Sequence, residues 1–144
     1  MSISIAIVLH LSACDSDGIR SRYEEHSLQI GDRMVEVELA DTAHERSQGF
    51  SFRDRPAHGQ GVLFVYPEAA RPKVRTDNVS FPTTLAYIEE DGVIGFIQES
   101  NPNGHDLSPP PTAVRFILQV NRGWFRQGDG IGQTVLGLDG LVGK

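Results

Sequence analysis

The chain has 144 residues and a formal net charge of −6, which is enough for one compact domain and too short for two domains with separate cores. Hydrophobic residues make up 39% and charged residues 22%, values that are typical of a soluble globular protein and exclude a disordered chain. The acidic balance argues against nucleic acid as a partner, because phosphate binding requires a surplus of Lys and Arg.

The N-terminus has the pattern of an export signal followed by a lipid anchor. Residues 1–13 contain no Asp, Glu, Lys or Arg and end in Leu-Ser-Ala directly before Cys14, and this apolar run is too short to span a bilayer. Leu, a small residue, Ala and Cys form a lipobox, in which small residues fit the peptidase cleft and the Cys thiol is acylated. We expect a signal peptide over residues 1–13, a lipidated Cys14 with a polar tether over residues 14–26, and a single domain over residues 27–144.

The alternative is a hydrophobic first strand with an incidental cysteine. No Lys or Arg precedes the apolar run and His10 interrupts it, and both features favour this alternative. Against it, Cys14 is the only cysteine and cannot form an internal disulfide. A polar segment follows at once over residues 15–18, as is common in lipoproteins. We therefore expect export to the bacterial cell envelope or periplasm and membrane attachment through acylated Cys14.

Downstream of the tether, short apolar runs are separated by turn residues. Alternating or continuous apolar patterns predict strands. The turns at Gly31-Asp32 and Asp91-Gly92 predict two hairpins. The expected strands cover residues 27–30, 33–39, 62–65, 85–88, 93–98, 113–121 and 134–138.

Helical signals are few. Thr42 and Glu45 have the spacing of a capping box, and Gly49 is a suitable stop, so a short helix is expected over residues 43–48. Phe50 and Phe52 are then expected to turn inward. Residues 66–73 and 101–111 are expected to be loops, and residues 123–125 a turn or short helix. The predicted fold class is mainly β: a single-domain β-sandwich or partly closed barrel with one or two short helices.

Polar and aromatic residues between and after these strands suggest a ligand site. Asp77 and Asn78 lie in a polar stretch between two prolines. Asn121 is the last residue of the strand expected over residues 113–121, and Trp124 follows shortly after it. A carboxylate, amides and an indole are the chemistry of a site for a sugar or another small polar ligand. The same residues also suit a solvated edge, with Trp124 as a core anchor.

Other chemistry has little support in the sequence. The five histidines do not have metal-ligand spacing, and no CxxC motif occurs. The glycine-rich stretch over residues 128–132 lacks the Lys-Ser/Thr of a P-loop and is expected to be a turn. We therefore predict no metal site and no cofactor, and assign no catalytic residue.

Several ordered blocks of sequence, from residue 27 to residue 138, resemble the domain of unknown function 192 family. The resemblance implies a compact, mostly β domain with a short helix in a protein that is commonly exported or lipid-anchored in bacteria. It implies no reaction, because no activity is established for the family. The blocks are residues 37–42 (VELADT), 45–49 (ERSQG), 61–65 (GVLFV), Asn78, Pro82, 85–88 (LAYI) and 118–125 (LQVNRGWF).

Some residues match the family pattern and some depart from it. Arg46, Asn78, Asn121 and Trp124 match and are carried over as candidate cleft or packing residues. The family usually reads Trp-Met-Lys-Asn-Thr where this chain has Arg-Thr-Asp-Asn-Val over residues 75–79. It usually follows the proline with an aliphatic residue and Asp, where this chain has Thr83 and Thr84, and it often has Glu in place of Gln119. A function that needs the missing Lys and Asp is expected to be weakened or changed.

Three functions remain open from the sequence. The first is a lipid-anchored envelope protein that binds a small polar ligand, such as a glycan fragment. The second is a protein-interaction or accessory module of the envelope, with Phe50, Phe52 and the proline-rich loop to Pro111 as its surface. The third is a hydrolase that uses Asp77 with His58 or His105 as acid and base.

Replacing the expected lipidation site tests the anchor. Cys14→Ala removes the thiol that is acylated, and two or more acyl chains are needed to hold a protein stably on a membrane. We expect the variant to leave the membrane fraction on cell fractionation, whereas the parent chain stays in it. A variant that fractionates with the membrane as the parent does would show that Cys14 is not the anchor.

Overall fold

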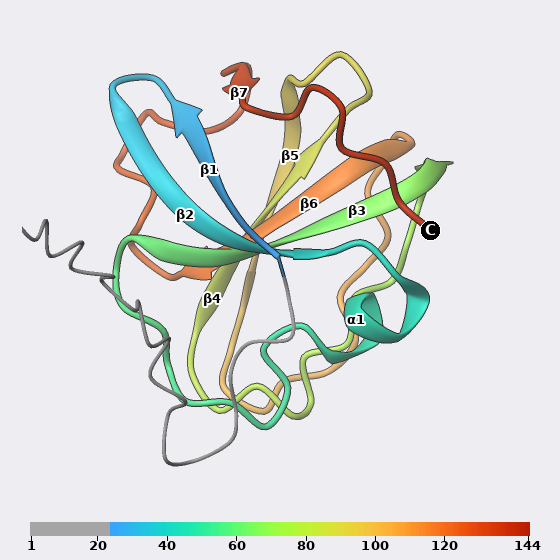
Figure 1. Ribbon diagram of the computed structural model, residues 1–144. Helices are drawn as coiled ribbons and strands as arrows, with labels where there is room; N and C mark the ends of the chain where they lie inside the picture. The colour runs from blue at the N-terminus through green and yellow to red at the C-terminus, as the bar shows by residue number, and fades with distance from the viewer. Residues whose placement is uncertain (1–23) are drawn as a thin grey trace, which may run out of the picture.

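The computed structural model describes residues 24–144, so the expected signal peptide, Cys14 and most of the tether lie outside the described residues. The described part of the chain forms one sheet and one short helix (Figure 1). No helix within it is long and apolar enough to cross a membrane. Its elements are β1 (Glu25–Ile30), β2 (Arg33–Ala40), α1 (Ala43–Gln48), β3 (Gln60–Ala70), β4 (Thr83–Ile88), β5 (Ile94–Ser100), β6 (Val114–Asn121) and β7 (Val135–Leu136).

The seven strands of this sheet follow the order β5-β4-β6-β3-β2-β1-β7. β2 and β3 pair in parallel, and the other neighbours are antiparallel. Antiparallel strands can be joined by tight turns, whereas a parallel pair needs a crossover that carries the chain back along the sheet. That crossover contains α1, which lies at one end of the sheet (Figure 1).

The sheet curls until its two edges meet at one end. β7 pairs with β1, and the residue before it, Thr134, forms an antiparallel bridge with Val93 at the start of β5. The N–H of Ile94 donates to the carbonyl of Gln133 at 3.0 Å. The result is a curled half-barrel with one short helix, so the predicted mainly β fold is confirmed in its partly closed form.

The sheet has a hydrophobic cluster on each face. Alternate residues of β6 show the division, because Leu118 packs in one cluster and Ile117 in the other. The first cluster includes Val35, Leu63 and Trp124 and lies inside the curl. The second cluster lies against the outer face and is covered by the segments that follow α1 and β3; its larger members are Phe50, Phe64, Val74, Phe81, Leu85 and Tyr87.

Local signals predicted several elements correctly. Thr42 is the N-cap of α1: its Oγ1 accepts from the Glu45 N–H at 3.1 Å, and its own N–H donates to Glu45 Oε1 at 3.1 Å. The expected capping box is therefore present. β1 and β2 form the first predicted hairpin, and β4 and β5 form the second, with Gly92 at a φ of 86° in its turn.

Other local predictions were wrong. Residues 66–70 belong to β3 rather than to a loop, although Pro67 offers no N–H and the pairing with β6 is irregular between Val65 and Ala70. Phe50 is buried as predicted, but Phe52 points outward and is 81% exposed. For residues 123–125, where a turn or a short helix was predicted, the structure shows the turn.

The contact between β3 and β6 leaves no room for a side chain at Gly61. A Cβ built there would lie 2.6 Å from the carbonyl oxygen of Gln119 and 2.9 Å from Val120 Cγ1. We expect Gly61→Ala to lower the free energy of unfolding by about 1–3 kcal/mol, because the two strands must move apart. Gly59→Ala is the matched control, since a Cβ at residue 59 meets nothing within 4 Å. Equal stability of both variants in urea unfolding would contradict this account of the contact.

Candidate functional site

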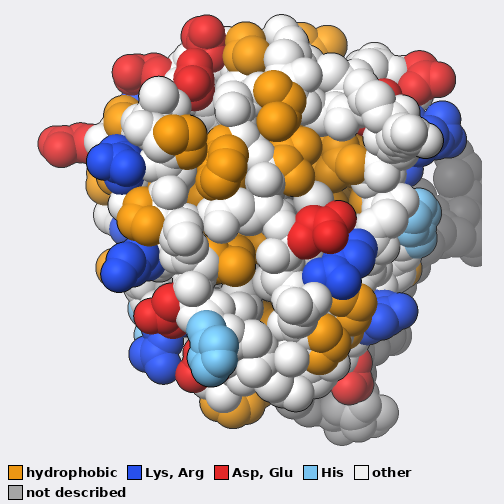
Figure 2. Space-filling model, turned by 180° about the vertical axis from the view of Figure 1, so that it is seen from behind, with side chains coloured by type: hydrophobic (Ala, Val, Ile, Leu, Met, Phe, Trp, Pro, Cys, Tyr) orange, Lys and Arg blue, Asp and Glu red, His pale blue; other side chains and the backbone are white. Residues whose placement is uncertain are grey.

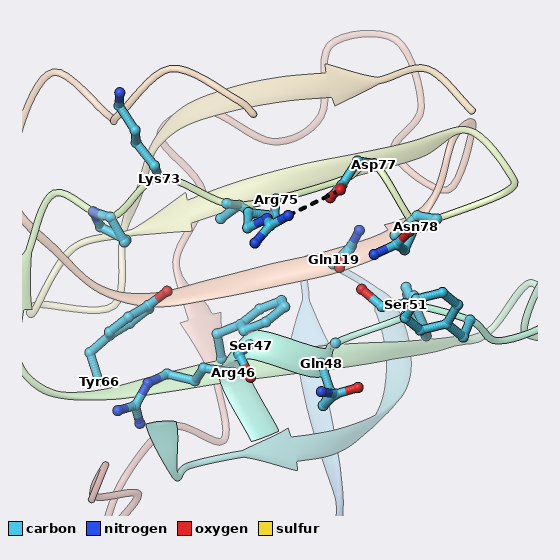
Figure 3. A pocket seen from close by; sticks show the side chains of 17 residues that line it. Arg46, Ser47, Gln48, Ser51, Tyr66, Lys73, Arg75, Asp77, Asn78 and Gln119 are labelled. Atoms are coloured by element: carbon cyan, nitrogen blue, oxygen red, sulfur yellow. Dashed lines mark hydrogen bonds and ion pairs between the residues drawn. The ribbon is translucent and has the colours of Figure 1, made fainter. Parts of the chain in front are cut away.

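A cleft of about 470 Å³ opens above the second cluster, between the α1–β3 crossover and the segment that follows β3 (Figure 3). One wall comes from the end of α1 and the residues after it. The other wall is the segment over residues 72–79, and β3 and β6 supply the base. The polar side chains that line the cleft are Arg46, Ser47, Gln48, Ser51, Tyr66, Lys73, Arg75, Asp77, Asn78 and Gln119.

The wall over residues 73–77 alternates strictly between buried and exposed residues. Val74 and Thr76 are buried, while Lys73, Arg75 and Asp77 are exposed; Arg75 points into the cleft, and Lys73 extends away from it (Figure 3). The buried residues are held by the long loop before β6. Thr76 Oγ1 donates to the carbonyl of His105 at 2.8 Å, and the carbonyl of Val74 accepts the N–H of Leu107 at 2.9 Å. This anchoring fixes the wall and places Arg75 and Asp77 at the cleft.

Within the part of the chain that the structure describes, Arg75 and Asp77 have partners, whereas Lys73 has none. Arg75 Nη2 lies 3.1 Å from Asp77 Oδ2, and Arg75 Nε lies 3.9 Å from Asp106 Oδ1. The hydrogen bond to Asp77 and the negative charges of both Asp residues raise the pKa of Arg75 above its usual value. The Lys73 ammonium has no hydrogen bond or ion pair within residues 24–144, and its side chain extends away from the cleft (Figure 3).

Tyr66 faces this wall from β3. Its hydroxyl points into the cleft towards the wall that carries Lys73 and Arg75 (Figure 3). Burial raises the pKa of Tyr66 to about 12, although the positive charge of Arg46 lowers it somewhat. The phenol therefore stays protonated at neutral pH and can donate a hydrogen bond.

Arg46 holds the cleft together rather than reaching into it. Its Nη1 donates to the carbonyls of Asp41 at 2.7 Å and Val65 at 2.8 Å, and its Nη2 donates to the carbonyl of Lys144 at 2.9 Å. The guanidinium lies 5.1 Å from the ring centroid of Tyr66 and points away from the cleft (Figure 3). Arg46 thus ties the helix, β3 and the C-terminal segment to one another.

Gln119 lies at the base of the cleft and is only 2% exposed. Its Nε2 donates to Thr83 Oγ1 at 3.0 Å, whereas its Oε1 accepts no hydrogen bond from the described residues. Gly49 lies beside this oxygen, and a Cβ at residue 49 would be 3.5 Å from Oε1 and 2.8 Å from Phe64 Cζ. The glycine therefore allows the crossover to pass close to β3 and β6 without covering the amide.

Phe52 stands at the rim in a backbone conformation that is rare for a large residue. Its φ is 60°, and its side chain is 81% exposed. Its N–H donates to the carbonyl of Asn78 at 2.9 Å, which joins the two walls. Positive φ at a bulky residue is costly and is concentrated at functional sites.

The structure brings together three of the five predicted ligand residues, because Arg46, Asp77 and Asn78 line the cleft. Asn121 and Trp124 do not line it. Asn121 is buried, and its Nδ2 donates to the carbonyl of Pro56 at 2.8 Å. Trp124 is part of the first cluster. The guanidinium of Arg33 lies over its ring, 3.9 Å from the ring centroid.

Tyr66, Lys73 and Ser51 were not predicted as site residues, and Gln119 was recognised only as a departure from the family pattern. Tyr66 and Lys73 fell in a stretch expected to be a plain loop. The alternation of charged and small or apolar residues over residues 73–77 is a signal that could have indicated an extended wall with one charged face. No local pattern could have placed Gln119 beside Gly49, because that contact joins distant strands.

The sequence pattern of the DUF192 family, described as "Uncharacterized ACR", matches residues 26–135. This chain belongs to the DUF192 family. None of the curated proteins matches it.

Solved structures share this DUF192 fold. A Sinorhizobium meliloti protein described as a "putative transcription regulator" superposes with a TM-score of 0.74 at 24% identity, over 83% of this chain and 98% of that chain. A protein of unknown function from Novosphingobium aromaticivorans superposes with a TM-score of 0.74 at 21% identity, over 80% of this chain and 86% of that chain. At these identities the likeness shows the fold alone.

Four of the departures from the usual DUF192 pattern line the cleft. On one wall, Arg75, Asp77 and Val79 occupy positions where Trp, Lys and Thr are usual, and Gln119 lies at the base where Glu is frequent. Thr84, which replaces an Asp, is buried in β4 and does not line the cleft. The charge of this cleft therefore differs from the common pattern at both its wall and its base.

Removing the Arg46 guanidinium tests its structural role. Arg46→Met keeps most of the aliphatic stem but loses the hydrogen bonds to three backbone carbonyls. We expect the free energy of unfolding to fall by about 2–3 kcal/mol, given the usual strength of charge-assisted hydrogen bonds. Arg55→Met is the matched control, because residue 55 is exposed and lies outside the cleft. Equal urea midpoints for the two variants would show that the hydrogen bonds of Arg46 do not stabilise the fold.

Proposed function

We propose that this protein is a lipid-anchored protein of the bacterial cell envelope that binds a small polar ligand, such as a glycan fragment, in this cleft. The observation that carries the proposal is the Gln119 amide, buried at the base of an open cleft with an oxygen that the described residues leave without a donor. Among the described residues, the fully enclosed side-chain atom without a partner is Asn121 Oδ1 and not Gln119 Oε1, so Gln119 Oε1 is open to the cleft, where a ligand hydroxyl can donate to it in place of water.

The chemistry of the lining supports a hydroxyl-bearing ligand. A sugar hydroxyl both donates and accepts, and the cleft offers partners for each role: Asp77 and Gln119 present acceptors, and Arg75 and Asn78 present donors. Phe50, Phe64 and Phe52 add apolar surface at the base and rim, on which the C–H face of a sugar ring can pack. Ligand sites commonly combine apolar walls with a few directed polar groups.

Both walls are held in place without a ligand, which supports binding of a small molecule. The hydrogen bond from Phe52 to Asn78 joins them, the one from Thr76 to His105 anchors one wall, and Arg46 anchors the other. A site that is already ordered loses less conformational entropy on binding.

The envelope location is supported by the sequence. The lipobox at residues 11–14 and the polar tether precede the domain, and the resemblance stated above is to proteins that are commonly exported or lipid-anchored. The proposed ligand is therefore one that is found in the envelope or periplasm.

The other functions have less support. Neither His58 nor His105 lines the cleft that Asp77 lines, so a hydrolase has no imidazole there. For a protein-interaction module, Phe50 is buried and only Phe52 of the two aromatic residues is exposed. Nucleic acid is not proposed, because the chain carries a net charge of −6 and the face in Figure 2 shows acidic and basic side chains interspersed.

A ligand screen with a cleft variant tests the proposal. We expect one class among envelope glycans and other small polar molecules to raise the thermal midpoint of the purified protein. A ligand at 100 times its dissociation constant stabilises by about 2.7 kcal/mol, or several degrees. The shift should disappear in Asn78→Ala, whose side chain makes no hydrogen bond with the described residues. Gln127→Ala, which removes an exposed amide outside the cleft, should keep it.

Two results would count against this function. Absence of a shift with every compound would remove the small-molecule proposal and favour a protein partner. A large loss of stability in Asn78→Ala without ligand would mark Asn78 as a structural residue instead of a binding residue.

A further inference from the structure

We propose that the ligand of this cleft carries an acetamido group, as an N-acetylated amino sugar does, and that this group binds against the Gln119 amide oxygen beside Gly49. The inference rests on the proposed function, because it requires that the cleft bind a small polar molecule. It adds the chemical class of that molecule and the position of one of its groups.

The Gln119 amide presents a hydrogen-bond acceptor at the base of the cleft. Its Nε2 donates to Thr83 Oγ1 at 3.0 Å, and Thr83 Oγ1 lies 2.6 Å from Ser100 Oγ. Thr83 can therefore accept from Gln119 and donate its own proton to Ser100. None of these three residues is more than 2% exposed, so bulk water does not compete for this chain of hydrogen bonds. The bond to Thr83 leaves the amide oxygen as the group of Gln119 that is available to a ligand.

The surface next to this oxygen is apolar and has no side chain over it. A Cβ on Gly49 would lie 3.5 Å from Gln119 Oε1 and 2.8 Å from Phe64 Cζ, so one glycine lies against both groups. Phe50 lines the same cleft. An acceptor bordered by aromatic carbon suits a ligand donor with an apolar group beside it. A planar trans acetamido group has that form, because its N–H and its methyl group lie on the same edge.

Donors for the acetamido oxygen are available at the same end of the cleft. Ser51 and Asn78 lie there with Gln119, away from Lys73 and Tyr66 (Figure 3). The Ser51 hydroxyl and the Asn78 amide make no hydrogen bond with other described residues, so each can donate to a ligand oxygen. Because an acetamido group has its N–H and its carbonyl on opposite edges, it can bridge the Gln119 oxygen and one of these donors.

The charges of the cleft favour a neutral group over an ammonium. Of the described residues, Asp77 alone supplies a carboxylate to the lining, and Arg75 Nη2 lies 3.1 Å from it. The side chains of Lys73 and Arg46 point away from the cleft (Figure 3). We therefore expect the cleft to bind the acetylated form of an amino sugar and not the free amine, which would lack a counter-charge.

Matched disaccharides test the inference by isothermal titration calorimetry on the purified protein. N,N′-diacetylchitobiose and cellobiose have the same glycosidic linkage and differ only in carrying an acetamido or a hydroxyl group at the second carbon of each ring. We expect the acetylated disaccharide to bind about tenfold more tightly, as one added hydrogen bond and one buried methyl group together allow. Chitobiose, the free diamine, should bind no more tightly than cellobiose.

Variants of the amide and of its partner connect this preference to the proposed contact. Gln119→Met keeps the length of the side chain but removes the acceptor, so the affinity for N,N′-diacetylchitobiose should fall to that for cellobiose. Thr83→Val removes the hydroxyl that orients the amide, at a residue that does not line the cleft. It should reduce the same preference and leave the affinity for cellobiose unchanged. Gln127→Met makes the matched change at an exposed residue outside the cleft and should alter neither affinity.

Several outcomes would overturn the inference. It fails if the two disaccharides bind equally, if neither binds at millimolar concentration, or if the preference survives in Gln119→Met or, should that variant not fold, in Thr83→Val. If cellobiose binds as tightly as the acetylated form and Asn78→Ala abolishes that binding, the proposed function stands and only the acetamido group is wrong. If neither these sugars nor any compound of the wider screen binds, both proposals fail together.

Discussion

The parallel pairing of β2 and β3 is the constraint on which the cleft depends. A parallel neighbour cannot be reached by a tight turn, so the chain must return along the sheet before β3 begins. The return path contains α1, Gly49 and Phe52, and these form one wall of the cleft. Arg46 then fixes that path through hydrogen bonds to carbonyls before α1, in β3 and at the C-terminal segment. A geometric requirement of the sheet thus produces the concavity.

The second wall shows how packing distributes charge. Val74 and Thr76 are buried beneath the long loop before β6, and an extended backbone then turns their neighbours to the opposite side. Packing of the buried pair therefore keeps the charged neighbours Lys73, Arg75 and Asp77 exposed. Asp77 engages Arg75, so the two charges that this wall places at the cleft are paired with each other.

The mainly β class, both hairpins and the capped helix could be predicted from the sequence, because each depends on residues close together in the chain. The loop predicted over residues 66–70 was wrong, since the pairing with β6 overrides the local effect of Pro67. The inward orientation predicted for Phe52 was also wrong: its N–H donates to the carbonyl of Asn78, its φ is positive and its side chain points outward. Within the candidate site, Asp77 and Asn78 were predicted from a dense run of polar residues, whereas Tyr66 and Lys73 had no comparable signal.

Periodicity, glycine positions and ordered motifs are local properties, so the amino-acid sequence was enough to predict most strands, the turns, the helix cap and the resemblance to the DUF192 family. Which polar residues share a site depends on the folded arrangement. Asn121 and Trp124 looked like ligand residues in the chain, but they pack against Pro56 and Arg33 in the fold. Gln119 looked like an ordinary strand residue, yet it forms the base of the cleft. The physical reason is that strand order and curl bring together residues that are distant in the chain, and no local pattern records those contacts.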